Sequence, residues 1–326
     1  MKMEQVSNKC FAVLNEKNRV CDANSGLINI GGGMVIDTQS DLNHARQMIE
    51  MFSDVWSEMP KQVVNTHEDL DHIVGNQLFE GAEIIGHRSL PERMKSVANP
   101  EEIQKLMRMA NGTLTGPLLN LIHPGVVASA RQLKEDYDFS GFRLVTPTTL
   151  FDDRLITNLE DMEVHIIHVG PCHQVGDAIV WLPNERVLFA GDVIFRLCTP
   201  MGWVGTFDKW FETLDFIANE LKPDVIVPGH GPVCGIEGAT DMKAYLQYVQ
   251  NESRLFYDAG LSVRDASRKV DFGPYSDWIS PERIYLNIER AYREFRGEPP
   301  DKPWEQAKTF DEIYKTARTR GLNPVF

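Results

Sequence analysis

The sequence predicts an α/β protein, a four-layer αββα sandwich in which two mixed β-sheets pack face to face between outer helices. Two observations predict this fold. Short apolar segments with strand character occur in two runs, at residues 26–87 and from about 143 to 230, and helical segments are interleaved with them. Longer helical stretches occupy residues 88–142 and follow residue 237, so we expect a helical insertion and a helical C-terminal extension.

The first run of strands begins with a hairpin. The segments GLINI (26–30) and GMVIDT (33–38) flank the glycines at 31–33, which predicts two paired strands around a turn. Residues 42–56 carry apolar side chains at helical spacing. Strands at 61–67 and 82–87 then bracket the helix HIVGNQLF, which completes a strand-helix-strand unit.

The second run of strands follows the predicted insertion. Asn99 and Pro100 form a helix cap and first-turn pair within that insertion. Beyond it, the predicted strands are 142–151, 162–170, 177–183, 186–195 and 224–230, with a helix at 208–221. We therefore predict a core over residues 1–237, with the insertion at about 88–142, and a helical extension over 238–326.

Composition limits the partners and the compartment. The 326 residues carry a net charge of −14, which disfavours nucleic acids and anionic membrane surfaces because both would repel the protein. No segment approaches the ~20 apolar residues of a membrane span. The five cysteines (Cys10, Cys21, Cys172, Cys198, Cys234) are odd in number and lack Cys-x-x-Cys spacing, which is typical of reduced thiols. We expect a cytoplasmic protein.

Histidines and aspartates gather where the predicted strands end. The segment THEDLDH (66–72) follows one strand, and single groups follow three later strands, at His173, Asp192 and His230. Loops at one edge of a sheet can converge although they are far apart in sequence. Four imidazoles and three carboxylates buried together without a cation would be costly to desolvate and would repel one another. They therefore predict a metal site.

These motifs resemble those of a known family. THEDLDH, followed in order by GPCH, FAGD and VPGH, is similar to the pattern of the metallo-β-lactamase superfamily of binuclear metallohydrolases. The resemblance covers roughly residues 20–235. It implies a metallo-β-lactamase fold and two divalent metal ions, most often zinc.

The resemblance also implies a role for each ligand. The first metal ion would be held by His67, Asp69 and His173, and the second by Asp71, His72 and His230. Asp192 would bridge both ions. A hydroxide between the metals would be the nucleophile, and Asp71 would orient it and could relay a proton.

Asp69 departs from the family pattern, which usually has a histidine at this position. With Asp69, the formal charges of two divalent ions, three aspartates and a hydroxide sum to zero. The usual histidine at this position would give a sum of +1. The harder oxygen ligand of Asp69 favours iron or manganese over zinc in the first site. A carboxylate here also resembles the flavodiiron branch of the superfamily, which reduces oxygen or nitric oxide and carries a flavodoxin domain. Here about 90 residues with helical character and no Ser/Thr/Gly-rich phosphate loop follow His230.

Other histidines and polar residues are interpreted as structural. We expect packing or surface roles for His44, His87, His123 and His165, and a surface position for Glu68. His168 is either a partner of a metal-bound group or a core histidine. Buried thiols explain Cys172 and Cys198. Trp203 is the aromatic residue that we would first expect to touch a substrate, although core packing is the favoured interpretation.

The insertion carries an apolar stripe at helical spacing. By default such a stripe is helix core, but it could also form a wall or lid over the substrate, or a dimer face. Its members are Leu106, Met109, Leu114, Leu118, Leu119, Ile122 and Val126.

Three classes of function follow from these observations. The first is a metal-dependent hydrolase acting on a small, apolar ester, thioester or lactone. The second is a di-iron redox enzyme acting on oxygen or nitric oxide. The third is a non-catalytic metal-binding protein of the same fold. For the hydrolase we expect a small-molecule substrate, no nucleic acid or membrane partner, and a homodimer as an open alternative.

Overall fold

The first of two mixed β-sheets contains the N-terminal strands. The computed structural model describes residues 1–19, 21–56 and 58–324. The first sheet has the spatial order β1 to β7, antiparallel through β4 and parallel from there on. Its strands are β1 (Lys2–Gln5), β2 (Cys10–Leu14), β3 (Ser25–Ile28), β4 (Met34–Ile36), β5 (Gln62–Val64), β6 (Glu83–His87) and β7 (Thr149–Phe151).

The second sheet contains the remaining strands, in the order β12-β11-β10-β9-β8. Strand β12 pairs parallel with β11, and the other pairs are antiparallel. Its strands are β8 (Arg154–Leu159), β9 (Met162–His168), β10 (Ala178–Leu182), β11 (Val187–Phe195) and β12 (Val225–His230). Strand β11 is buried along its whole length, which places Asp192 in the interior.

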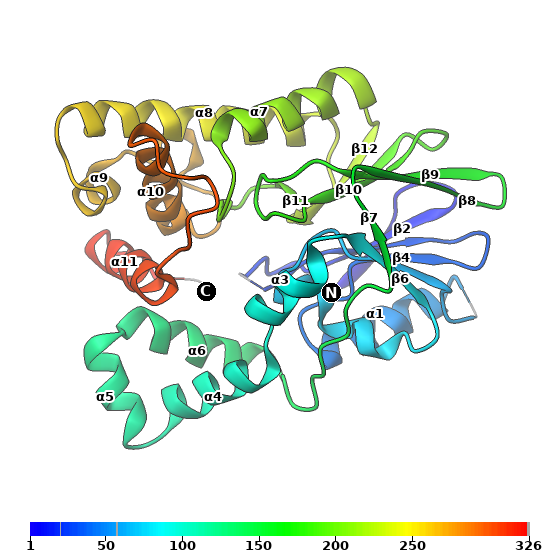
Figure 1. Cartoon of the computed structure of the whole chain (residues 1–326), viewed down its shortest axis with the longest axis horizontal. Coiled ribbons are helices and arrows are strands. Elements are labelled where there is room, and N and C mark those ends of the chain that lie inside the picture. Colours follow the sequence, from blue (N-terminus) through cyan, green and yellow to red (C-terminus); the bar gives the residue numbers. More distant parts are fainter. Residues whose placement is uncertain (20, 57, 325–326) are drawn as a thin grey trace.

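The two sheets pack face to face and helices cover both outer faces (Figure 1). Alternate residues of the two sheets, such as Ile36, Val64, Val180 and Phe189, form the apolar core between them. Helix α1 (Leu42–Ser53) packs on the first sheet, and helices α7 (Phe207–Phe216) and α8 (Glu237–Asp258) cover the second. The predicted αββα sandwich is confirmed.

The insertion and the C-terminal extension are helical and touch each other. The insertion holds α3 (Leu90–Val97), α4 (Pro100–Asn111), α5 (Thr115–Ile122) and α6 (Pro124–Asp136). After α8, the extension holds α9 (Val263–Lys269), α10 (Ile284–Phe295) and α11 (Gln306–Thr319). Helix α11 packs against α6, and the His123 ring nitrogen Nδ1 lies 2.8 Å from Asp311 Oδ2 across this contact (Figure 1).

Short helical turns complete the chain. Helix α2 (Leu70–Ile73) is one turn long and continues into a 3₁₀ segment, Val74–Leu78. A π-helical turn, Ile217–Leu221, extends α7, and further 3₁₀ turns lie at Gly273–Tyr275 and Pro281–Arg283. No helix in the described part of the chain has the length and apolar character needed to cross a bilayer.

Several strands differ from the prediction. Strands β1, β2 and β8 were not predicted; β1 and β8 are half exposed, so their polar residues hide the strand pattern. Of the predicted strand 142–151, only Thr149–Phe151 forms a strand. Pro147 lies within the predicted segment, and a proline cannot donate a hydrogen bond to a neighbouring strand. The glycine turn between β3 and β4 is confirmed, with φ between +61° and +97° at Gly31, Gly32 and Gly33.

The apolar stripe of the insertion is mostly on the surface, so its interpretation as helix core is wrong. Leu114 is 87% exposed and Leu118 is 63% exposed, and Leu106, Met109 and Ile122 are exposed as well. Leu119 alone of this stripe packs against the small cluster beneath α5. Helical spacing predicts which residues share a face, but only the tertiary structure decides whether another element covers that face.

Candidate metal centre

Seven side chains meet at one edge of the sandwich: four follow β5, His173 follows β9, Asp192 lies within β11, and His230 ends β12. They form three overlapping groups whose possible ligand atoms lie within 4.8 Å of one another. The groups are His67, Asp69 and His173; Asp71, His72 and His230; and His67, His72 and Asp192. The structure thus brings together every residue for which a metal-binding role was predicted, and Asp192 lies between the other two groups.

Asp192 is the central carboxylate of this cluster. Its Oδ2 lies 3.4 Å from Nε2 of His173 and 3.4 Å from Nε2 of His230, and its Oδ1 lies 3.2 Å from Nε2 of His72. His67 Nε2 is 3.9 Å from Asp192 Oδ2. One carboxylate that faces all four imidazoles has the position expected of a ligand that bridges two metal ions.

The inner atoms of the cluster fit a metal ion. Nε2 of His67, Nε2 of His72 and Oδ1 of Asp192 are buried and make no well-aligned hydrogen bond. Buried polar atoms without partners are rare because each costs free energy to desolvate. A cation coordinated by these atoms removes that cost, so the residues present suit divalent metal ions.

The charges of the cluster depend on burial and on the neighbouring groups. Burial lowers the pKa of His173, but the carboxylates of Asp192 and Asp69 outweigh burial and raise it to about 10. Burial likewise opposes the charge on His230, and Asp192 with Asp71 raises its pKa to about 9. Burial alone would raise the pKa of Asp192, yet the surrounding histidines hold it well below its usual range. Metal ions that bind here must therefore displace protons from the imidazoles.

Outer hydrogen bonds fix the orientation of the ligands. Asp37 Oδ2 lies 2.8 Å from Nδ1 of His72 and accepts the Thr66 hydroxyl proton at 2.7 Å, and Thr66 Oγ1 lies 3.0 Å from Nδ1 of His67. The His173 Nδ1 contacts the backbone oxygen of Met201. Such partners leave Nε2 of each ring free to face the metal.

Asp69 is also held in place. Gln174 donates its side-chain N–H to Asp69 Oδ1 at 2.7 Å, while Asp69 Oδ2 lies 2.9 Å from Nε2 of His173. Oδ2 is therefore the oxygen that faces the cluster. The carboxylate at this position has a specific partner, which is what a ligand requires.

The loop that carries His173 is anchored by Asp177. Its buried carboxylate accepts backbone N–H groups of Cys172, His173 and Gln174 at 2.7 to 3.1 Å. His168, for which two roles were predicted, contacts the Val175 oxygen at 2.9 Å through Nε2. It supports this loop and does not contact a residue of the cluster directly.

Glu68 is buried, so the predicted surface position is wrong. Its side chain is 0% exposed, pairs with Arg93 of helix α3, and accepts the Gly176 N–H at 3.1 Å. The prediction assumed that the chain leaves the sheet with alternate residues facing solvent. Helix α3 instead covers the outward face of this loop, which only the packing of the insertion decides.

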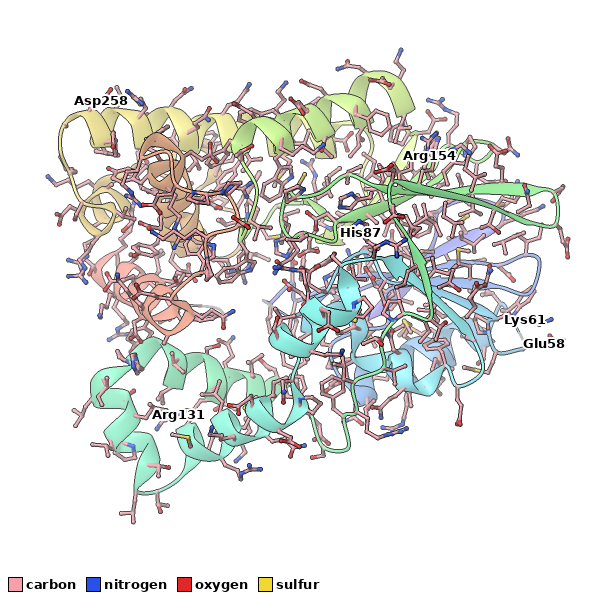
Figure 2. The ribbon with its side chains drawn as sticks, viewed as in Figure 1. Glu58, Lys61, His87, Arg131, Arg154 and Asp258 are labelled. Atoms are coloured by element: carbon pink, nitrogen blue, oxygen red, sulfur yellow. The ribbon has the colours of Figure 1, made fainter. Side chains whose placement is uncertain are left out.

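The other single residues behave largely as predicted. Cys172 and Cys198 are buried and all five cysteines are free thiols. His87 stacks on His168 with ring centroids 3.8 Å apart, at the end of β6 (Figure 2). His44 contacts Asp41 beside the start of α1, and His165 contacts Glu163.

Residues that sequence reasoning missed are Asp37, Asp177 and Gln174. Asp37 follows directly on strand β4, the position that identified the other site residues.

A cleft of about 510 Å³ opens onto the cluster. Its floor includes Asp69, Asp71, His173, Asp192 and His230. Its walls come from helix α3 of the insertion, from residues 195–204 and from the C-terminal extension, which contributes Arg283 and residues 301–310. Trp203 lines this cleft, and its ring meets that of Trp304 edge to face at 5.7 Å.

We expect Asp37→Asn to weaken metal binding by about 10- to 100-fold, because the amide cannot hold His72 and Thr66 as the carboxylate does. The measurement is a competition titration with a chromophoric chelator. The exposed Asp161→Asn variant is the matched control. Equal affinities in the two variants would contradict the role of Asp37.

Comparison with known proteins agrees with this geometry. The model of the metallo-β-lactamase superfamily matches residues 18–230, more than half of the chain. The chain therefore belongs to the metallo-β-lactamase superfamily, and the predicted resemblance is confirmed. It is 30% identical over 149 residues to the metallo-beta-lactamase type 2 of Bacteroides fragilis, a region that spans 44% of this chain and 59% of that protein.

Solved structures share the fold at low identity. The stereoselective inverting sec-alkylsulfatase Pisa1 from Pseudomonas sp. aligns with a TM-score of 0.65 and 18% identity, over 93% of this chain and 51% of that chain. A metallo-beta-lactamase family protein from Thermus thermophilus aligns with a TM-score of 0.60 and 16% identity, over 90% of this chain and 95% of that one. Identities this low establish the common fold alone.

Proposed function

We propose that the protein is a binuclear metal-dependent hydrolase acting on a small, largely apolar ester, thioester or lactone. The observation that carries this proposal is the buried cluster of seven side chains, with unpartnered inner atoms, at the floor of a cleft. Divalent ions held there supply a hydroxide near neutral pH and an electrophile for the substrate oxygen.

The residues of the cleft divide the remaining work. Asp71 lines the cleft and its Oδ2 lies 3.3 Å from Nε2 of His230, so we assign to it the orientation of the nucleophile and the acceptance of a proton. Apolar side chains such as Phe195, Met201, Trp203 and Phe310 bind the body of the substrate and exclude water. Arg93 and Arg283 also line these walls, and Arg93 is paired with the buried carboxylate of Glu68.

The first experiment is elemental analysis of protein purified without added metal, combined with a visible spectrum. Two zinc or manganese ions per chain and no colour support the hydrolase. The protein is then assayed with esters, thioesters and lactones, and with sulfate esters because one structural neighbour is an alkylsulfatase. Iron with visible absorption would instead favour a di-iron redox enzyme. This is the second candidate function because Asp69 places a carboxylate in the first metal site. Bound metal without turnover of any substrate class would favour a non-catalytic member of the fold.

Asp69→His tests the metal preference directly. We expect the ratio of bound zinc to bound manganese to rise about tenfold or more, because an imidazole replaces a hard oxygen ligand. The ratio is measured after dialysis against an equimolar mixture of the two ions, with Asp161→His at the surface as control. An unchanged ratio would show that Asp69 does not contact a metal ion.

A further inference from the structure

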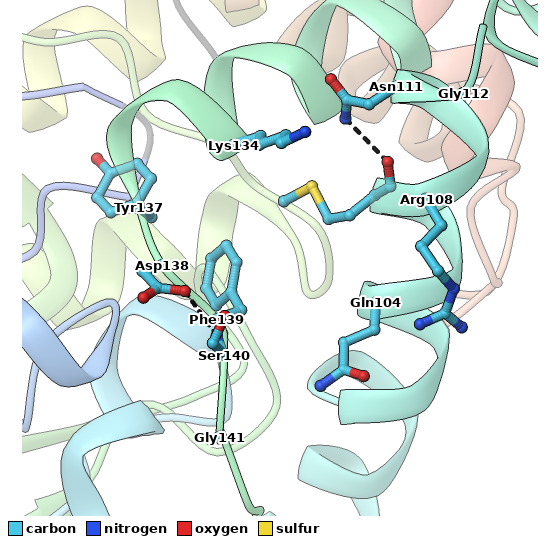
Figure 3. Close-up of a pocket in the computed structure, with 11 residues that line it drawn as sticks. Gln104, Arg108, Asn111, Gly112, Lys134, Tyr137, Asp138, Phe139, Ser140 and Gly141 are labelled. Atoms are coloured by element: carbon cyan, nitrogen blue, oxygen red, sulfur yellow. Dashed lines mark hydrogen bonds between the residues drawn. The ribbon is translucent and has the colours of Figure 1, made fainter.

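A second cavity lies apart from the metal cleft, between the helical insertion and the segment that returns from it to the sheets. Its volume is about 700 Å³, within the range of roughly 300–1,000 Å³ that is usual for small-molecule sites. None of its lining residues lines the metal cleft. Figure 3 shows the cavity with helix α4 on one side and residues 137–141 on the other.

One face of helix α4 forms the first wall. Its members, Gln104, Met107, Arg108 and Asn111, recur at spacings of three and four residues, so they share a single stripe of the helix. The opposite wall consists of Lys134 near the end of α6 and of the following residues, including Tyr137 and Phe139. The cavity is therefore bounded by elements that the insertion itself provides.

The floor of the cavity is apolar. Tyr137 and Phe139 are each 6% exposed, and Met107 of helix α4 also lines the cavity. The Tyr137 hydroxyl donates a hydrogen bond to Asp22 Oδ1 at 2.7 Å, so the phenol oxygen is directed away from the cavity. The ring of Phe139 points into the space between the walls (Figure 3).

The charged groups of the cavity are two cations, Arg108 and Lys134, and one carboxylate, Asp138. In the described residues no carboxylate lies within ion-pair distance of Arg108 or Lys134. The acidic residue of the lining, Asp138, uses Oδ1 to accept the Ser140 N–H at 2.8 Å. The helix dipole favours lysine and arginine in the last turn of a helix, and this explains why Arg108 and Lys134 occur where they do. It does not explain why an amphipathic cavity lies beside them.

We propose that this cavity is a second ligand site, which binds a small amphipathic carboxylate. Lys134 and Arg108, which stand on different walls, supply the positive charge for the carboxylate group, and the apolar chain lies on Met107 and Phe139. In a protein with a net charge of −14, two cations without ion-pair partners beside an apolar floor favour an anion over a cation.

Methionine methyl groups give a local test of this site. The metal-loaded protein is labelled with [¹³C-methyl]methionine and titrated with octanoate. Met107 reports on the second cavity, and Met201 reports on the metal cleft. Their signals are assigned with Met107→Leu and Met201→Leu. We expect the Met107 signal to shift and saturate, whether or not the Met201 signal also moves.

Charge variants decide the chemistry of recognition. The double variant Arg108→Gln with Lys134→Gln is expected to weaken the Met107 response about tenfold or more. The matched control is Arg131→Gln, which removes a charge from α6 outside the cavity (Figure 2) and should leave the response unchanged. Octanamide, the neutral analogue, is expected to bind about tenfold more weakly than octanoate.

Two outcomes would overturn the proposal. One is a shift of Met201 without a shift of Met107, which would place the carboxylate only at the metal centre. The other is a Met107 response that the double variant and the control weaken equally. The exposed positions of Arg108 and Lys134 make loss of folding unexpected, and circular dichroism of each variant checks this.

Discussion

Asp192→Ala is expected to lower metal content from about two ions per chain to one or fewer and to reduce hydrolysis by about three orders of magnitude or more, equivalent to about 4 kcal/mol of transition-state stabilisation. The reason is geometric. Asp192 lies within 3.2 to 3.9 Å of all four imidazoles, so neither predicted metal position keeps its full ligand set without it.

Metal content is measured by elemental analysis, and activity with whichever ester or thioester the wild-type protein hydrolyses. The control is Asp161→Ala, whose side chain is 80% exposed and pairs with Lys9 at the surface. If Asp192→Ala kept both its metal and its hydrolysis, the bridging position assigned to Asp192 would be incorrect.

Glu68→Ala is expected to lower the free energy of unfolding by about 3 kcal/mol, because it breaks a buried ion pair and leaves the Gly176 N–H without an acceptor. We take the lower end of the usual range because Arg93 is 34% exposed and can regain water. Urea denaturation of metal-loaded protein measures the change.

The matched control is Glu92→Ala on α3, the helix that carries Arg93. Glu92 is 82% exposed and pairs with Lys95, so its loss should change stability by less than about 0.5 kcal/mol. Glu68→Ala should also weaken metal binding, because Glu68 joins the loop of His67 and Asp69 to the loop of His173. Similar unfolding free energies for both variants would show that this buried pair contributes little.

Glycine residues next to the metal centre show how tightly its loops approach one another. A Cβ atom on Gly229, which precedes His230, would lie 1.9 Å from Asp192 Oδ1. Gly191, which precedes Asp192, has a φ of +50° and meets the Thr66 side chain. The sequence shows glycine beside each of these ligands, but the reason is visible only when β11 is placed beside β12 and against the segment that follows β5.

The sequence by itself determined most of the order of strands and helices in the sandwich, without β1, β2 and β8, and the seven side chains at its edge. It could do so because the strands beside these residues are strongly apolar, and a polar residue next to such a strand is conspicuous. Asp37 follows β4 directly but was missed because it lies outside the ligand motifs, and Asp177 was missed because it precedes a strand instead of following one.

Only the tertiary structure decided which surfaces are covered. Glu68 is buried because helix α3 packs over it, whereas Leu118 and Leu121 of α5 are exposed because no described element packs on them. The walls of the metal cleft include Arg93, Trp203 and Trp304. Each of these residues lies more than 100 positions from the next in the sequence. Local periodicity records which residues share a face, but burial depends on contacts between distant segments, which no local pattern specifies.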